Sequence, residues 1–303
     1  MMNPKHTFPI LTAIFLLTAS LACNLFTPER STPATADSPI PTDTTAPTDA
    51  PIPTDALVPT DTATPTDEPA PSGISVSFSG VSFTIPTGLG SGGRPESIAA
   101  VDGQGSPGWD VAPAHTKFTL QNYPLQGTML HPEIYVFPAV EYEKVSAGAA
   151  ESLKRLRALT SGAGMGIDNQ VVPFVPFFNA TQTFEARALL MKFQNGTGIR
   201  MLTQYDQALI PVNNHELIYH FEGLTSDGSY YIIAVFPINS PILPAEGSPN
   251  SIVPAGGVPF NENDPLAYFD AITQNLNNAA PESFIPKLAA MDALIESIKA
   301  SAP

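Results

Sequence analysis

Apolar and polar residues alternate along much of the chain after residue 73, and this period of two predicts β-strands. The runs 74–78 and 81–85 alternate on either side of Gly80, so they predict a hairpin. Two more strands are expected at 115–120 and 133–137. These four runs indicate that the folded part of the chain begins with β-structure.

The clearest alternation lies between residues 183 and 238. It consists of four successive runs, at 183–193, 198–206, 215–224 and 229–238. Asn195-Gly196 and Asp227-Gly228 separate neighbouring runs, and such pairs tolerate the positive φ angles of tight hairpin turns. The pattern therefore predicts an antiparallel meander. In the third run, Leu217, Tyr219 and Phe221 are expected to face a core, whereas Glu216, His220 and Glu222 are expected on a wetter face.

Apolar spacing of three and four residues predicts helices elsewhere in the chain. One is expected over 142–160, a second opens at Asp264-Pro265, and a third opens at Ser283. The Gly- and Pro-rich stretch 86–113 is expected to be a loop. The predicted fold class is α+β, with an antiparallel meander sheet covered by helices, in a single domain over residues 74–303.

The N-terminus carries a different pattern. Lys5 precedes an apolar run at 8–22, which is shorter than the about 20 residues that a membrane-spanning helix needs. Cys23, the single cysteine of the chain, follows at once in the box Ser20-Leu-Ala-Cys23. This layout predicts a lipoprotein signal peptide at 1–22 and lipid attachment at Cys23. The alternative is an ordinary secretory signal cut near Ala22, which would leave Cys23 as a free thiol.

Residues 23–73 are rich in Thr, Pro and Asp. Pro-Thr-Asp recurs five times between residues 41 and 67 with a period of six. Such a composition is too polar and too rich in proline to build a core, so we expect a disordered linker. An O-glycosylated stalk is the other structure that this composition allows. Either would hold the domain off the membrane.

Charge restricts the partners of the protein. The chain has a net charge of −15, and residues 74–303 hold 20 acidic and 11 basic residues. An acidic domain is a poor partner for nucleic acid or for anionic lipid without an anchor. The expected partners are a membrane, through lipid on Cys23, and an unknown envelope protein or small ligand.

Two resemblances bear on these expectations. The segments 193–205 and 212–231 resemble a family of uncharacterised bacterial envelope lipoproteins with Thr/Pro-rich linkers. That resemblance implies an extracytoplasmic, lipid-anchored location, and because the family is uncharacterised it lends no activity. The strand ending at Ile85-Pro86, the meander and the last amphipathic helix are also similar, at the level of fold, to the PsbP-like α/β/α sandwich. Function does not follow from that likeness.

No motif in the sequence predicts catalysis. His215 and His220 resemble a zinc-protease pair, but they are five residues apart rather than four, and on a strand they face opposite sides. Two glycine-rich stretches, at 88–93 and 103–108, fit the dinucleotide pattern without leading into a predicted helix. We therefore expect no cofactor, no metal and no catalytic residue.

Three functions stay open on the sequence. The first is a non-enzymatic binding or accessory domain. The second is a hydrolase with a dispersed site, whose base would be His115, His131, His215 or His220. The third is a domain that binds a small ligand or a glycan, for which Trp109 is the candidate contact because it stands in a Gly/Pro-rich loop. Trp109 could equally fold back to cover the core.

Overall fold

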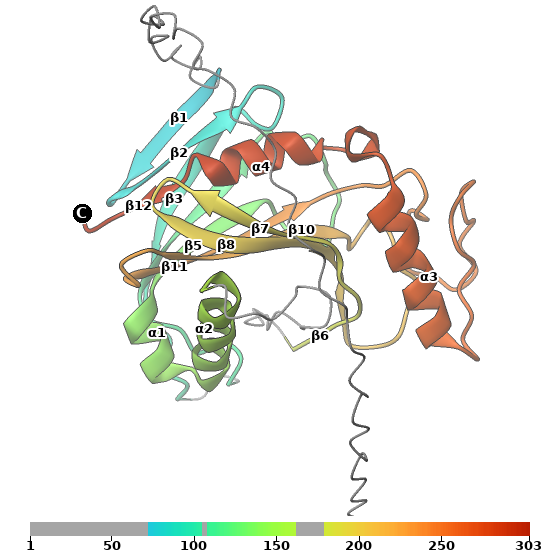
Figure 1. The fold of residues 1–303 in the computed structure, drawn as a ribbon, viewed down its shortest axis with the longest axis horizontal. Coiled ribbons are helices and arrows are strands. Elements are labelled where there is room, and N and C mark those ends of the chain that lie inside the picture. The colour runs from blue at the N-terminus through green and yellow to red at the C-terminus, as the bar shows by residue number, and fades with distance from the viewer. Residues whose placement is uncertain (1–71, 105–107, 162–178) are drawn as a thin grey trace, which may run out of the picture. The chain divides into compact units, whose positions relative to one another are not determined.

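A seven-stranded antiparallel sheet forms the centre of the structure (Figure 1). The computed structural model describes residues 72–104, 108–161 and 179–303. The predicted signal peptide, Cys23 and the Pro-Thr-Asp repeats lie outside the described residues. No helix within the described ranges is long and apolar enough to cross a membrane.

The meander predicted from the alternating runs is present in the sheet. Across the sheet the strands are β3 (Gly92–Ile98), β4 (His115–Gln121), β5 (Glu133–Pro138), β11 (Tyr230–Pro237), β10 (Ile218–Thr225), β8 (Gly196–Thr203) and β7 (Ala186–Phe193). Every neighbouring pair is antiparallel. The Asn195-Gly196 and Asp227-Gly228 pairs lie at the β7–β8 and β10–β11 turns, as their turn chemistry predicts.

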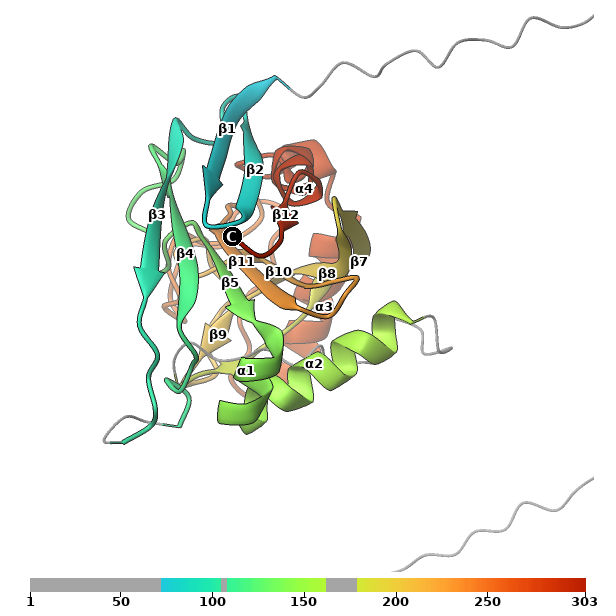
Figure 2. The same cartoon turned by 90° about the vertical axis from the view of Figure 1, so that its left-hand side faces the viewer.

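Helices cover both faces of this sheet, so the α+β prediction is confirmed (Figures 1 and 2). On one face lie α1 (Ala139–Val145) and α2 (Ala147–Thr160), which pack over β5, β8, β10 and β11. The other face is covered by α4 (Leu288–Glu296) and by a small three-stranded sheet. That sheet consists of β1 (Gly73–Phe78), β2 (Val81–Pro86) and β12 (Lys299–Ala300). Helix α3 (Pro265–Asn278) packs against β7. The remaining short elements are β6 (Thr181–Gln182), β9 (Tyr205–Asp206) and the 3₁₀ turn Pro281–Ser283.

Three details of the sequence-based prediction are wrong. The expected loop 86–113 contains strand β3, whose residues are mostly exposed and polar, so they show no apolar alternation. Pro95 is tolerated there because β3 is an edge strand. The expected helix 142–160 is two helices, since Ser146 is extended and its Oγ accepts a hydrogen bond from Ala149 N at 3.3 Å, which caps α2.

The third error concerns the last helix. Ser283 ends a 3₁₀ turn instead of opening a helix, and α4 begins at Leu288. Between them Phe284 is buried, and Ile285 exchanges two backbone hydrogen bonds with Asn239, at 2.7 and 3.0 Å. This extended connection ties the C-terminal helices to the end of β11, which apolar spacing alone does not indicate.

The last residues of the chain seal the first hairpin. β12 pairs with β2, and Ser301 N donates to Gly80 O at 2.9 Å. Ser297 Oγ accepts a hydrogen bond from Thr84 N at 2.9 Å. Asn195, at the β7–β8 turn, donates from Nδ2 to Ala300 O at 2.6 Å. These contacts join the C-terminal residues to the β1–β2 hairpin and to the β7–β8 turn.

The face expected to be wetter is buried. Glu222 and His220 are both 0 % exposed, because α2 lies over β10 on that side. His220 Nε2 lies 3.0 Å from Glu222 Oε1, and Tyr231 OH donates to Glu222 Oε2 at 2.6 Å. A charged side chain withdrawn from water is tolerated when such partners satisfy it. The alternation of β10 is therefore correct, but it separates two buried faces.

Candidate functional site

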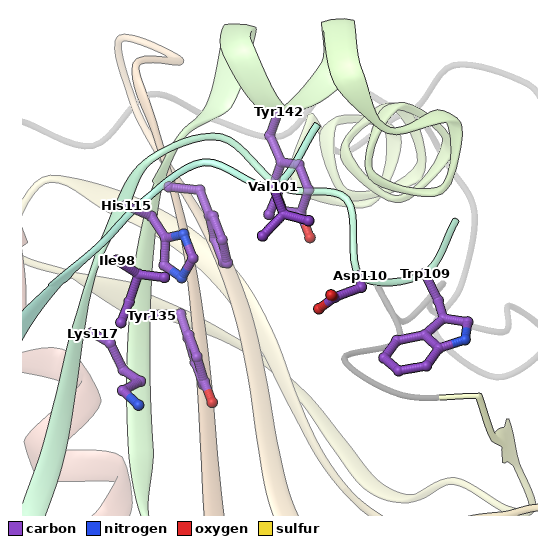
Figure 3. A pocket seen from close by; sticks show the side chains of 10 residues that line it. Ile98, Val101, Trp109, Asp110, His115, Lys117, Tyr135 and Tyr142 are labelled. Carbon is purple, nitrogen blue, oxygen red and sulfur yellow. The ribbon is translucent and has the colours of Figure 1, made fainter. Parts of the chain in front are cut away.

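A pocket of about 240 Å³ opens where β3, β4 and β5 meet α1 (Figure 3). Its aromatic lining comes from Trp109, His115, Tyr135, Phe137 and Tyr142, and its charged lining comes from Asp110 and Lys117. Pockets that hold drug-sized ligands usually measure about 300–1,000 Å³ and combine apolar walls with a few polar groups. This pocket has the same kind of lining at a smaller size.

Strand register brings most of these side chains together. His115 and Lys117 are two residues apart on β4, so they lie on the same face of the sheet. Lys117 is paired with Tyr135 of β5, and His115 is paired with Ile98 of β3. Cross-strand partners lie within about 5.5 Å of each other. The antiparallel pairing therefore builds this side of the pocket.

A loop between β3 and β4 supplies Trp109 and Asp110. The base of the loop is held by Val101 and Ala112, which exchange backbone hydrogen bonds of 2.9 and 3.2 Å. Trp109 is 37 % exposed, so its indole lies at the rim and does not cap the core. Of the two placements that the sequence left open for Trp109, the structure has the one beside a pocket. Its role in ligand binding stays a prediction.

The inner wall is a cluster of aromatic rings. The His115 and Phe137 ring centroids are 4.3 Å apart, and those of Phe137 and Tyr142 are 4.4 Å apart. Tyr135 stacks parallel to Phe137 with centroids 6.1 Å apart. Phe137 and Tyr142 are 1 % and 2 % exposed, whereas Tyr135 is half-buried. Such packing fixes the rings, so the wall is largely pre-formed for a ligand.

The surroundings of His115 favour its neutral imidazole form. Burial lowers its pKa below the ordinary value of 6.5, and the charge of Lys117 acts in the same direction against a hydrogen bond to Pro113. Its Nδ1 lies 2.9 Å from Pro113 O, which can only accept, so the proton is on Nδ1. The Nε2 atom is consequently the hydrogen-bond acceptor of this ring.

Carboxylates outnumber cations around the pocket. Lys117 Nζ lies 3.4 Å from Glu96 Oε2 and 3.5 Å from Glu133 Oε1. Tyr135 OH donates to Glu133, and burial together with that carboxylate raises the pKa of Tyr135. Glu96 and Glu133 flank this lysine, and Asp110 belongs to the pocket lining, so three acidic groups and one lysine lie in or beside the pocket. The net local charge is about −2, because His115 is neutral.

The hydrolase hypothesis finds no assembled site in the described residues. His131 is exposed beside a shallow hollow, and His220 is buried against Glu222. His215 lines a hollow together with Glu216 and Ser248, but no hydrogen bond joins Ser248 to His215 in the described part of the chain. The Nδ1 atom of His215 lies 2.8 Å from Gly127 O, so a backbone carbonyl orients this ring instead of a carboxylate.

Metal binding receives no support from the described residues. Among residues 72–104, 108–161 and 179–303, no three His, Cys, Asp or Glu side chains are placed to hold an ion. The glycine-rich stretch 88–93 leads into strand β3 and not into a helix, so it lacks the helix N-terminus that a dinucleotide phosphate needs. Residues 105–107 of the second glycine-rich stretch lie outside the described residues.

No protein-family model, curated protein or solved structure matches this chain. Function therefore has to be inferred from the pocket. Of its residues the sequence singles out two, Trp109 as a candidate ligand contact and His115 as one of four candidate bases. Asp110 adjoins Trp109, and the Tyr135/Phe137 pair repeats an aromatic residue at the strand period, which is the signal that locates the inner wall.

A second group of polar side chains gives a prediction about pH. Burial, opposed by a hydrogen bond from Gln204 and aided by the neighbouring Glu216, raises the pKa of Asp206 from its ordinary value of 3.8 to about 7. Folding therefore favours the protonated form, and stability should fall as pH rises from about 4 to about 7. Replacing Asp206 by Asn should flatten this decline and make the variant more stable than the wild type at pH 8.

Urea denaturation at pH 4, 6 and 8 measures this effect. Asp270→Asn, on the exposed side of α3, is the matched control and should follow the wild type. An Asp206→Asn protein with the wild-type pH slope would contradict the prediction.

Proposed function

We propose that residues 74–303 form a non-enzymatic binding domain that holds a small ligand in the pocket beside Trp109. The observation that carries the proposal is the convergence of aromatic rings from β4, β5, α1 and the β3–β4 loop on one pocket with few charged groups. Ligand sites have this composition. Because the volume is only about 240 Å³, the expected ligand is a single ring or a compact head group.

The proposal includes a location outside the cytoplasm. Signal peptide 1–22 would be removed, a lipid on Cys23 would anchor the chain in the membrane, and linker 23–73 would hold the domain away from the surface. The support is the order of these segments in the sequence, together with the lack of a second cysteine that could pair with Cys23. A tethered domain with a small pocket suits capture of a ligand or assistance to an envelope partner.

Trp109 gives the binding proposal a specific test. It is the single tryptophan of the chain, so emission excited at a wavelength that tyrosine does not absorb reports on this pocket. Titration with a panel of small amines, aromatic compounds and sugars should yield at least one compound that shifts or quenches the emission. By calorimetry, Trp109→Ala should weaken binding of that compound by at least about tenfold, as expected for an aromatic contact.

Leu266→Ala is the matched control for this test. Leu266 is 77 % exposed on α3, away from the pocket lining, so its replacement should leave affinity unchanged. The binding proposal is wrong if no compound in the panel changes Trp109 emission and none raises the melting temperature.

The anchor is tested by Cys23→Ser in the full chain. We expect the wild-type protein to carry an acyl label and to sediment with membranes, since two or more chains anchor a protein stably. The variant should lose the label and move largely to the soluble fraction. Cys23→Ser protein that stays in the membrane fraction in wild-type amount would sink the lipid-anchor proposal.

A further inference from the structure

We infer that the ligand of the pocket beside Trp109 is a small organic cation, an alkylated ammonium group. This inference rests on the proposed binding function and names the chemistry of the ligand. It combines three observations: the aromatic walls, a carboxylate at the rim, and partners within the protein for His115 Nδ1, Tyr135 OH and Lys117.

The aromatic walls supply the first part of the recognition. Ring faces carry negative electrostatic potential, and a cation within about 6 Å of a Trp or Tyr centroid is attracted to them. Trp109 lies at the rim, and Tyr135 and Tyr142 line the interior. Stacking of Tyr135 on Phe137 holds its ring in place. An alkylated ammonium group also gains from burial of its methyl groups against these rings.

Asp110 supplies the opposite charge. In Figure 3 its carboxylate is seen between the Trp109 indole and the side of the pocket formed by His115 and Tyr135. Asp110 is exposed, and it forms no hydrogen bond or ion pair with any residue that the structure describes. A carboxylate at the rim of an aromatic pocket attracts a cation and opposes an anion.

Lys117 does not cancel the negative electrostatic potential that Asp110 contributes to the pocket. Its ammonium group lies between Glu96 and Glu133, so that group of three carries a net negative charge. The lowered pKa of His115 keeps the imidazole neutral at pH 7. Arg94 lies two residues before Glu96, on the same face of β3, but does not line the pocket. The domain as a whole is acidic, with 20 acidic and 11 basic residues over 74–303, which also favours encounter with cations.

The hydrogen-bonding groups of the pocket favour an alkylated cation over a sugar. His115 Nδ1 is bound to Pro113 O, Tyr135 OH to Glu133, and Lys117 to two carboxylates. A sugar must exchange many hydrogen bonds with water for bonds with protein, and unpaired hydroxyl groups are costly to bury. A quaternary ammonium group has no N–H donors, so it avoids that cost.

The test compares a cation with its neutral analogue on the purified chain. Choline and tetramethylammonium chloride are titrated against Trp109 fluorescence, beside 3,3-dimethylbutan-1-ol, which replaces the choline nitrogen by carbon, and glucose. We expect choline to bind about tenfold or more tightly than the alcohol, because only choline gains cation–π and carboxylate attraction. Choline affinity should also fall with added salt.

Variants assign the effect to this pocket. Asp110→Asn should weaken choline binding by about tenfold while leaving the neutral alcohol unchanged, and Asp110→Glu should restore most of the affinity. Asp102→Asn, in the same loop but outside the pocket lining, is the matched control. Circular dichroism and melting temperature check that each variant is folded.

The outcomes separate this inference from the proposed function. If glucose or the neutral alcohol changes Trp109 emission as strongly as choline does, the cation class is wrong and the binding function stands. If none of the four probes nor any compound of the wider panel affects Trp109, both proposals fail. Choline binding that is unaffected by Asp110→Asn places the cation elsewhere and also overturns the inference.

Discussion

Replacing His220 by Leu is expected to lower the free energy of unfolding by about 1–3 kcal/mol, the usual cost of leaving a buried polar group without its hydrogen-bond partner. The reason lies in Glu222, which is 0 % exposed and accepts from His220 Nε2 at 3.0 Å. Without His220, Glu222 Oε2 still accepts the hydrogen bond from Tyr231 OH at 2.6 Å, but Glu222 Oε1 loses its partner. Urea denaturation followed by circular dichroism measures the change.

A double variant distinguishes the buried carboxylate from loss of packing. In His220→Leu/Glu222→Leu the carboxyl group that lost its partner is also removed, so the double variant should be more stable than His220→Leu alone. Tyr231→Phe, which removes one hydrogen bond to the carboxylate, should cost about 1.5–3 kcal/mol. If the two Leu substitutions destabilise additively, the penalty does not come from an uncompensated Glu222.

The second large effect is expected for Phe221→Ala, which should lower the free energy of unfolding by about 3–5 kcal/mol. Phe221 is 0 % exposed and lies over two glycines that face each other across β8 and β10, Gly198 and Gly223. A Cβ added at Gly223 would lie 2.6 Å from the Phe221 ring, so the ring occupies the space that a side chain would take. Removing it leaves a cavity over bare backbone.

This arrangement gives an unusual double-mutant cycle. Gly223→Ala alone should be destabilising, because the Phe221 and Phe193 rings lie within 3 Å of the new Cβ. In the Phe221→Ala background the nearest clash is gone and the methyl group partly fills the cavity, so Gly223→Ala should cost much less or stabilise. Gly198→Ala is the control, since its Cβ would also meet the backbone oxygen of Glu222 at 2.2 Å and should remain destabilising in both backgrounds. Equal costs of Gly223→Ala in both backgrounds would contradict this account of the packing.

Parts of the fold could be predicted because local pattern and turn chemistry agree. β8 and β10 place polar residues between apolar ones, β11 is a short apolar run, and Asn-Gly and Asp-Gly pairs bound these strands, so the meander is visible in the sequence. β3 has no such pattern, because its residues are mostly exposed and polar. As an edge strand it also accepts Pro95, since one of its sides has no neighbouring strand that requires an N–H donor. His220 and Glu222 are buried because α2 lies over them. The alternation within a strand does not indicate which helix covers its second face.

The pocket was predictable only in part. Trp109 stands out because it is a single aromatic residue in a Gly/Pro-rich loop. The residues facing it come from β4, β5 and α1, and their meeting depends on the pairing of Lys117 with Tyr135 and on the path of the chain into α1. Asp206 gives no local signal either, since its raised pKa comes from burial and from Glu216, ten residues away in sequence.

The pairing of β12 with β2 cannot form until the C-terminal residues have been synthesised. A ribosome releases the β1–β2 hairpin long before β12, yet the contacts of Thr84 with Ser297 and of Ser301 with Gly80 span 213 and 221 positions. Until the last residues arrive, β2 has one edge without its strand, and such an edge is a template for pairing with another chain. Contacts between distant residues also slow folding. A variant that lacks residues 299–303 therefore leaves this edge of β2 open and should be less soluble than the chain that contains them.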